Sequence, residues 1–392
     1  MNEWKEYTVQ DLIDQGMLAE PMDGNHGSIH PKSSDYVSEG VPFIMANDLV
    51  NGVVDLINCS FISEKQAKML KKGFAHPNDV LLTHKATIGR TAIVPNKYET
   101  IILTPQVTYY RVLKGIDNRY LKYYFDSDFF QNTLRNWAGS GSTRAYIGIT
   151  AQRKLPIILP PLNVQTKIAT VLSLLDEKIS LNIAINENLE QQAQALFKAW
   201  FVDFEPFGGA MPDDWSECIL DSMCSLIIKG ITPKYNEHSA QLVINQKCVR
   251  NHQIDLSLAR CHEPKKVNEK WLQYGDIVVN STGTGTLGRA AQVLFTPNNM
   301  TVDSHVTIIR ASKQEYIYYL GLWATSHEHD FEMLQTGSTG QTDLPRERLK
   351  QMQIVLPSDS ILSSFSKVIK PIADIRIQKQ QENQRLSALR DT

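Results

Sequence analysis

The sequence predicts an α+β protein made of two repeated mixed α/β domains and two long helices that pair as an antiparallel coiled coil. Three observations support this prediction. Similar stretches recur about 200 residues apart, each repeat mixes strand and helix patterns, and a long helical segment follows each repeat. A duplicated chain of this kind is expected to relate its two domains by a pseudo-twofold axis.

The repeat is clearest in two stretches that end in glycine and arginine. Gly73 to Arg90 reads GFAHPNDVLLTHKATIGR, and Trp271 to Arg289 reads WLQYGDIVVNSTGTGTLGR. Asp79 matches Asp276 at an offset of 197 residues, and Gly89 matches Gly288 at an offset of 199. Two later matches, both dipeptides, keep nearly the same spacing: Gly139-Ser140 with Gly337-Ser338, and Leu159-Pro160 with Leu356-Pro357.

The first long helical segment runs from about Asn163 to Trp200 without proline or glycine. Its apolar residues recur at steps of three and four, which is typical of an amphipathic helix. The second follows Pro357, and Pro371 within it predicts a kink or a break. Because long helices are rarely stable alone in water, we expect the two to bury their apolar stripes against each other. The alternative is two unrelated surface helices on separate cores.

These patterns divide the chain into four segments. They are a first domain at 1–160, a helical segment at 161–207, a second domain at 208–356 and a final helical segment at 357–392. Within the first domain, strands are predicted at 80–82, 92–94, 106–112 and 157–159, and one helix at 120–137. A strand at 353–356 is predicted to close the second domain.

Composition is that of an ordinary globular protein, with 42% apolar and 21% charged residues. No apolar run approaches the length of a membrane span, and the start of the chain has no signal-peptide pattern. Five cysteines without paired spacing favour a reducing cytoplasm. The net charge of −2 argues against a strongly basic nucleic-acid binder. Binding to DNA would therefore require clustered basic residues, or basic partner subunits that contact the phosphates.

A twofold-related pair of domains nevertheless suits duplex DNA, a partner that is itself nearly twofold. The glycine-arginine elements are interpreted as hairpins whose turns carry these residues. The residues predicted to face a DNA groove there are Lys85, Thr87, Arg90, Thr284 and Arg289. Ordinary surface hairpins are the alternative. Gly283 to Gly288 also matches G-x-G-x-x-G, but a strand rather than a helix is predicted after it, which disfavours a dinucleotide site.

A second polar, glycine-containing loop occurs at the same offset in both repeats. Its predicted base or phosphate contacts are Ser140, Ser142, Thr143 and Arg144 in the first repeat, and Ser338, Thr339, Gln341 and Thr342 in the second. Hydroxyl, amide and guanidinium groups read base edges, and glycine lets the backbone approach closely. The alternative is a flexible loop before a helix. Different polar residues on a repeated scaffold are what two different half-sites would require.

Catalytic and metal-binding patterns are weak. Cys248, His252, Cys261 and His262 carry zinc-type donors, but their spacing fits no standard zinc site and the first repeat lacks them. The sequence has no phosphate-binding loop, nucleophile elbow or amino-methyltransferase motif. We therefore predict no catalytic residue, no metal site and no cofactor on this chain.

The segment that joins the two repeats resembles the central region of specificity subunits of type I restriction–modification systems. It begins Leu159-Pro-Pro-Leu162, continues through Gln165, Ile168, Ala169 and Leu172, and ends in WFVDFEPF at Trp200 to Phe207. The WFVDFEPF ending is the most distinctive part, and the resemblance extends over the whole chain. Val164 stands where a glutamate is common in this family.

The resemblance implies a non-catalytic DNA reader in a methyltransferase and restriction endonuclease complex. Each target-recognition domain would read one half of a bipartite double-stranded DNA site. Two modification (methyltransferase) subunits and the restriction subunits would supply the chemistry, with S-adenosylmethionine, ATP and Mg bound there. The residues expected to dock a modification subunit are Gln165, Ile168, Leu172, Trp200, Phe201 and Phe204. The rival interpretation is a coiled-coil scaffold or adaptor that binds no DNA.

Overall fold

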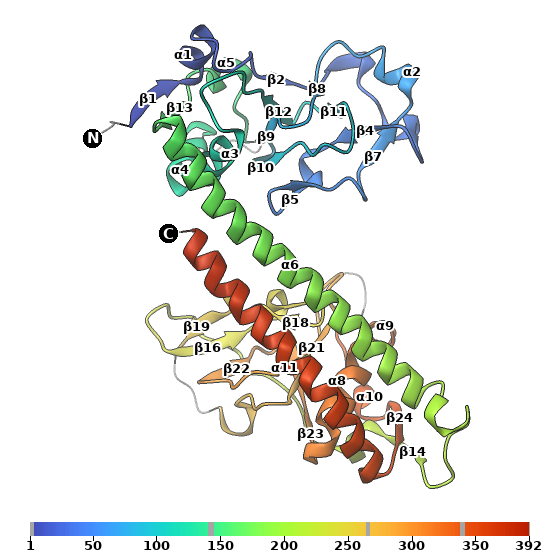
Figure 1. The fold of residues 1–392 in the computed structure, drawn as a ribbon. Helices are drawn as coiled ribbons and strands as arrows, with labels where there is room; N and C mark the ends of the chain where they lie inside the picture. The colour runs from blue at the N-terminus through green and yellow to red at the C-terminus, as the bar shows by residue number, and fades with distance from the viewer. Residues whose placement is uncertain (1–3, 140–144, 264–266, 338–341, 392) are drawn as a thin grey trace. The chain divides into compact units, whose positions relative to one another are not determined.

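The computed structural model describes residues 4–139, 145–263, 267–337 and 342–391. They form two compact units, one comprising residues 1–178 with 386–392 and the other residues 179–385. Each unit is rich in short strands, and the two long helices are α6 (Leu162–Phe201) and α11 (Asp359–Arg390) (Figure 1). The predicted α+β class is therefore confirmed.

The first unit is built on two mixed sheets. The six-stranded sheet has the order β2-β12-β9-β10-β6-β5 and the five-stranded sheet the order β3-β7-β4-β11-β8. The strands of the first sheet are β2 (Met22–Asp23), β12 (Val107–Tyr110), β9 (Val80–Lys85), β10 (Thr87–Ile93), β6 (Val53–Val54) and β5 (Leu49–Val50). Those of the second are β3 (Tyr36–Val37), β7 (Ser60–Ile62), β4 (Val41–Ile44), β11 (Ile101–Leu103) and β8 (Phe74–Ala75).

The ends of this unit are held together by β1 (Lys5–Thr8), which pairs antiparallel with β13 (Pro156–Leu159). Its short helices are α1 (Val9–Asp14), α2 (Glu64–Ala67), α3 (Asn118–Asp126), α4 (Asp128–Trp137) and α5 (Ile149–Gln152). The predicted single helix at 120–137 is wrong, because the chain breaks between α3 and α4 at Ser127. The Ser127 side chain accepts a hydrogen bond from the Phe130 backbone N–H and so caps a new helix.

The second unit repeats this arrangement with fewer strands. Its four-stranded sheet has the order β15-β23-β20-β21, and its three-stranded sheet the order β19-β16-β22. Their strands are β15 (Cys224–Lys229), β23 (Val306–Ala311), β20 (Ile277–Asn280), β21 (Ala290–Gln292), β19 (Arg260–His262), β16 (Gln241–Ile244) and β22 (Met300–Val302). A separate two-stranded sheet pairs β17 (Val249–Arg250) with β18 (Gln253–Ile254). The closing pair is β14 (Ser216–Ile219) with β24 (Gln353–Leu356), as β1 closes on β13.

The remaining helices of this unit are α7 (Leu220–Met223), α8 (Ile317–Ser326), α9 (Glu328–Met333) and α10 (Arg346–Lys350). The correspondence between the units extends to strand direction. The antiparallel set β12-β9-β10 matches β23-β20-β21, and the parallel pair β4 with β11 matches β16 with β22. The duplication read from the sequence is therefore a duplication of fold.

A buried ion pair occupies the same place in both units. Arg111, the residue after β12, binds the Asp79 carboxylate through two nitrogens, at 2.9 and 2.8 Å. Arg310 on β23 binds Asp276 in the same way, with both contacts at 2.7 Å. Each aspartate also accepts a backbone N–H three residues earlier, from His76 or Gln273. The sequence comparison matched these two aspartates, but it did not reveal their arginine partners.

The two long helices pair through polar contacts near the start of the second unit. Asn182 is fully buried and donates to Glu382 Oε2 at 3.0 Å and to Asn383 Oδ1 at 2.8 Å. Further along α6, the Asn186 side chain donates to the Arg376 carbonyl at 3.2 Å. As residue numbers rise in α6 they fall in α11, so the pairing is antiparallel as predicted. A second antiparallel contact, within the first unit, joins Asp176 to Arg390 at 3.0 Å.

Pro371 does not break its helix. α11 runs without interruption through this residue. Ile369 and Ala373, on either side of it, are 3% and 4% exposed. Burial of these flanking residues offsets the backbone hydrogen bond that proline cannot make.

Replacing Arg310 with alanine is predicted to destabilise the second unit by about 3–5 kcal/mol, because the Asp276 carboxylate would remain buried without a cation. The Asp276 side chain is 0% exposed and the Arg310 side chain 15%. Urea unfolding measures the effect. Arg346→Ala, which removes an exposed pair with Glu347, is the matched control and is expected to cost at most about 0.5 kcal/mol. Equal effects of the two substitutions would contradict this account.

Candidate nucleic-acid interface

The β9–β10 hairpin carries three of the predicted DNA contacts in the first unit. Lys85 ends β9, Thr87 begins β10, and Ala86 between them has a positive φ of 65°. Arg90 is exposed, and its guanidinium lies 3.3 Å from the Ala46 carbonyl. The prediction that glycine and arginine form the turn is wrong here. They lie within β10, where the register with β9 shifts between Ile88 and Thr91.

The corresponding loop in the second unit connects β20 to β21. Thr284 is exposed, and Arg289 is half-buried and donates to the Gly285 carbonyl at 2.8 Å. A strand on each side of the loop confirms the predicted context, which differs from the strand–helix context of a dinucleotide site. Packing explains the glycine at position 288, because a Cβ there would lie 2.6 Å from the Glu328 carbonyl oxygen of α9.

The predicted DNA contacts in the two polar, glycine-containing loops lie mostly outside the residues that the structure describes. Ser140, Ser142, Thr143, Arg144, Ser338, Thr339 and Gln341 lie outside the described residues. Thr342 is described and half-buried. The residue after it, Asp343, forms isolated β-bridges with both Thr282 and Thr336. Thr342 therefore lies near the same β20–β21 loop that carries Thr284 and Arg289.

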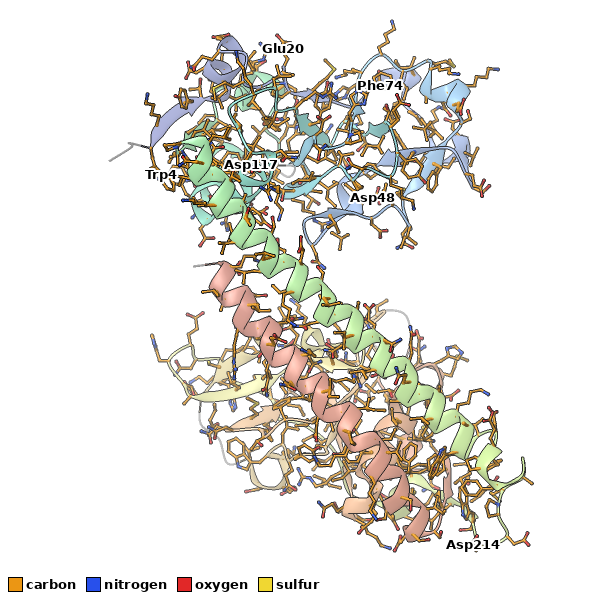
Figure 2. All side chains as sticks on the ribbon, in the orientation of Figure 1. Trp4, Glu20, Asp48, Phe74, Asp117 and Asp214 are labelled. Carbon is orange, nitrogen blue, oxygen red and sulfur yellow. The ribbon has the colours of Figure 1, made fainter. Side chains whose placement is uncertain are left out.

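Gln165 is not placed for direct contact with a partner. Its side chain is 1% exposed, its Oε1 accepts the Asp117 backbone N–H at 3.0 Å, and its Nε2 donates to the Pro160 carbonyl at 2.8 Å. Figure 2 labels Asp117 beside the start of α6. The expected docking contact is thus corrected for this residue: Gln165 fixes the start of α6 on its own unit, because its amide is used up internally.

The other residues expected to dock a partner are also buried or half-buried within their own units. Ile168 and Leu172 are half-buried, and Ile168 packs against the core of the first unit. Phe201 is 4% exposed, with ring centroids 4.7 Å from Tyr319 and 4.8 Å from Phe365. Trp200 and Phe204 are half-buried beside this aromatic cluster. The WFVDFEPF segment therefore has a packing role within the second unit.

Exposed apolar side chains occur on α6 at positions other than the expected docking residues. Within the first unit, Val171 and Leu174 are 58% and 59% exposed and lie three residues apart. Within the second unit, Leu181 is 56% exposed. The sequence carried a signal for these positions, because Val171, Leu174 and Leu181 are apolar residues outside the stripe of α6 that faces the interior.

A charged network joins the helices to the sheets of the second unit. Glu190 on α6 pairs with Arg376 on α11, and its Oε1 lies 3.1 Å from His252 Nδ1 in the β17–β18 turn. His252 Nε2 lies 3.7 Å from Glu328, which also accepts the Ala290 backbone N–H at the start of β21. The hydrogen bond to Glu190 raises the pKa of His252, and burial opposes this shift only in part. Burial lowers the pKa of Arg376.

The possible zinc donors do not assemble. His252 contacts carboxylates, and burial raises the pKa of the Cys248 thiol to about 11, which keeps it protonated. Among the residues that the structure describes, no group of three or more His, Cys, Asp or Glu side chains could hold a metal ion. Within the same described part of the chain, no helix is long and apolar enough to cross a membrane.

Comparison with known proteins shows similarity to one family. Residues 1–191 match the type I restriction modification DNA specificity domain. The MjaIX specificity subunit of Methanocaldococcus jannaschii is 26% identical over 99% of this chain and 91% of its own length. The HindI specificity subunit of Haemophilus influenzae is 27% identical over 60% of this chain and 49% of its own length. The solved S subunit from M. genitalium has a TM-score of 0.60 at 15% identity, covering 99% and 94% of the two chains, and therefore shares the fold.

The matching family model is a DNA specificity domain, and both of these relatives are specificity subunits. The chain is therefore similar to specificity subunits of type I restriction–modification systems, through residues 1–191 in the family comparison and over 99% of its length in the comparison with the MjaIX subunit.

The His252 network predicts a pH dependence of stability. Because the folded-state pKa of His252 is raised, its contribution is fully present below the unfolded value of about 6.5 and is lost as pH rises through the folded value. The urea midpoint of the second unit should therefore be higher at about pH 6 than at about pH 8.5. His252→Gln should reduce this difference. If the variant keeps the full difference, other groups cause the pH dependence.

Proposed function

We propose that each domain reads one half of a bipartite double-stranded DNA site, and that α6 and α11 hold the two readers at a fixed separation. The four segments 1–160, 161–207, 208–356 and 357–392 are the proposed recognition domain, central helix, recognition domain and terminal helix. The observation that carries this proposal is that the two units repeat one backbone arrangement, here called the frame, but carry different side chains on its surface. Asp79 with Arg111 and Asp276 with Arg310 fix equivalent strands.

The hairpin and loop residues supported by this frame differ between the units. Lys85 and Arg90 are cationic in the first unit, whereas Thr282 and Thr284 occupy the related loop of the second beside Arg289. Thr87 and Thr342 remain proposed contacts, as do the proposed residues at 140–144 and 338–341. Different polar groups on the same backbone frame would select different bases, because each base pair presents its own donors and acceptors in the major groove.

Charge limits what this chain contributes to affinity. The net charge of −2 gives little general attraction to phosphates. In the proposed complex, two modification subunits supply further phosphate contacts and the methyl donor S-adenosylmethionine. Restriction subunits supply the ATP- and Mg-dependent steps, and this chain carries no cofactor. The assembly acts in the cytoplasm, where DNA and these partners are accessible.

The proposed docking surface for a modification subunit is the exposed apolar face of α6. Val171 and Leu174 expose more than half of their side-chain surface within the first unit. Burial of such side chains on association contributes a favourable hydrophobic free energy. Ile168 on the same helix packs against the core of the first unit and Leu172 is half-buried, whereas Trp200, Phe201 and Phe204 pack in the core of the second unit.

Exchange of residues 208–356 for the same segment of another specificity subunit tests the division of labour. Because each domain reads its own half-site, mapping of methylated sites should show one half changed and the other retained. Exchange within one copy of a duplicated frame is expected to preserve folding, since the closing strands β14 and β24 both lie inside the exchanged segment. Changes in both halves would contradict the proposal. Absence of any DNA shift by the assembled complex would instead favour a scaffold.

Leu174→Glu is predicted to weaken co-purification with the modification subunit by about tenfold or more, because a carboxylate would be buried in an apolar contact. Ile57→Glu is the matched control, since Ile57 is 86% exposed in the same unit and belongs to the segment between β6 and β7, not to α6. Thermal unfolding of both variants should match the unmodified protein. Undiminished binding of the Leu174 variant would place the docking surface elsewhere.

A further inference from the structure

Tyr146 is an exposed aromatic residue held against the β9–β10 hairpin. Backbone hydrogen bonds fix the segment around it: the Ala86 N–H donates to the Ala145 carbonyl, and the Ile147 N–H donates to the His84 carbonyl, both at 3.0 Å. Lys85 and Tyr146 form an isolated antiparallel bridge between these two bonds. The position of this residue is therefore set by the hairpin.

The Tyr146 side chain also packs against its neighbours although half of it faces solvent. Its exposed fraction is 50%, its ring centroid lies 5.7 Å from that of His84, and the Lys85 ammonium lies 5.9 Å from it. A Cβ on Gly148 would approach the Tyr146 hydroxyl to 3.2 Å, so glycine leaves room for the ring. An aromatic ring that is exposed yet immobilised loses little conformational entropy when it binds a ligand.

The buried side chain of His84 stabilises the position of the segment that carries Tyr146. The His84 side chain is 1% exposed, and Nδ1 lies 3.0 Å from the Ile147 carbonyl, which can only accept. The neutral tautomer with a proton on Nδ1 satisfies this contact. Burial lowers the pKa of His84 and so maintains the neutral form. His84 thus connects the hairpin to the segment that carries Tyr146.

The second unit keeps the backbone arrangement and changes the chemistry. The Leu344 N–H donates to the Ser281 carbonyl at 2.8 Å, as Ile147 does to His84. Asp343 bridges Thr282 where Tyr146 bridges Lys85. The Asp343 carboxylate pairs with Lys229. An aromatic ring beside a cation in one unit is thus replaced by a carboxylate beside a cation in the other.

We infer that Tyr146 is a specificity-determining DNA contact of the first domain, with Lys85 beside it and His84 as its positioning residue. The phenol hydroxyl can donate to or accept from a base edge, the ring can contact a thymine methyl group, and the Lys85 ammonium can bind guanine O6 or N7. This inference rests on the proposed reading of half-sites. It identifies a contact that the hairpin and the segment around Tyr146 make together.

The test uses the complete modification complex and three duplexes, which are chosen after its methylated sites have been mapped. One carries the intact site, one has the first half-site altered and one has the second altered. Tyr146→Ala should weaken binding to the intact site by about tenfold or more, the size expected for one base contact. Binding to the duplex with the altered first half should change little, and discrimination at the second half should persist. Tyr146→Phe, which keeps the packing, should lose part of the first-half discrimination.

Positioning by His84 is tested by a double substitution. His84→Ala should reduce first-half discrimination, and adding it to Tyr146→Ala should produce almost no further loss, because both act through one contact. Phe129→Ala is the control, since Phe129 is 53% exposed on α4 and takes no part in the contacts that hold Tyr146. Additive losses would remove the positioning role from His84.

The outcomes separate this inference from the proposed function. Equal weakening on all three duplexes would make Tyr146 a general backbone contact and overturn the inference. Unchanged discrimination in both Tyr146 variants would also overturn it while leaving half-site reading intact. If the unmodified complex itself shows no preference among the duplexes, the proposed function fails. Should Tyr146→Ala not fold, as judged by thermal unfolding, Tyr146→Phe alone decides.

Discussion

The antiparallel pairing of α6 with α11 is the interaction on which the account depends. A helix of 40 residues is not expected to persist in water without burial against a partner. The contacts that set its register are polar: Asn182 donates to Asn383, Asn186 donates to the Arg376 carbonyl, and Glu190 pairs with Arg376. Apolar stripes can slide by a turn at modest cost, whereas buried amides and charges must find particular partners. These polar contacts therefore specify the register of α6 against α11 in addition to stabilising the pair.

Within each unit, the residues that fix the backbone are different from the residues that form the exposed surface. The Asp–Arg pair fixes the strand that leads into the hairpin or loop, and the closing strands hold the ends of the unit together. The surface residues on that frame differ, as the contrast between Tyr146 and Asp343 illustrates. A specificity protein benefits from this separation, because substitutions at exposed polar positions can change the bases selected without a large cost in folding free energy.

The sequence was sufficient for the duplication, the two long helices and most strands, because periodicity and repeated turn residues report local structure directly. It was insufficient where a residue's role depends on distant partners. Gln165 matched a docking pattern, yet its amide is consumed by the Asp117 and Pro160 backbone. Asn182 and Asn186 carried no apolar signal, although they lie at the centre of the helix pair. Tyr146 was missed because only the fold brings it to Lys85.

The most direct test of the helix pair as a spacer is a matched lengthening of both helices. Seven residues would be inserted between Asn182 and Asn186 of α6 and seven between Arg376 and Glu382 of α11, which preserves the heptad spacing and leaves the contacts on either side intact. The insertion adds about 10.5 Å at 1.5 Å per residue, equivalent to about three base pairs. Mapping of methylated sites should show the unread gap lengthened by about that amount, with both half-sites unchanged. An unchanged gap in a folded, active complex would contradict the account.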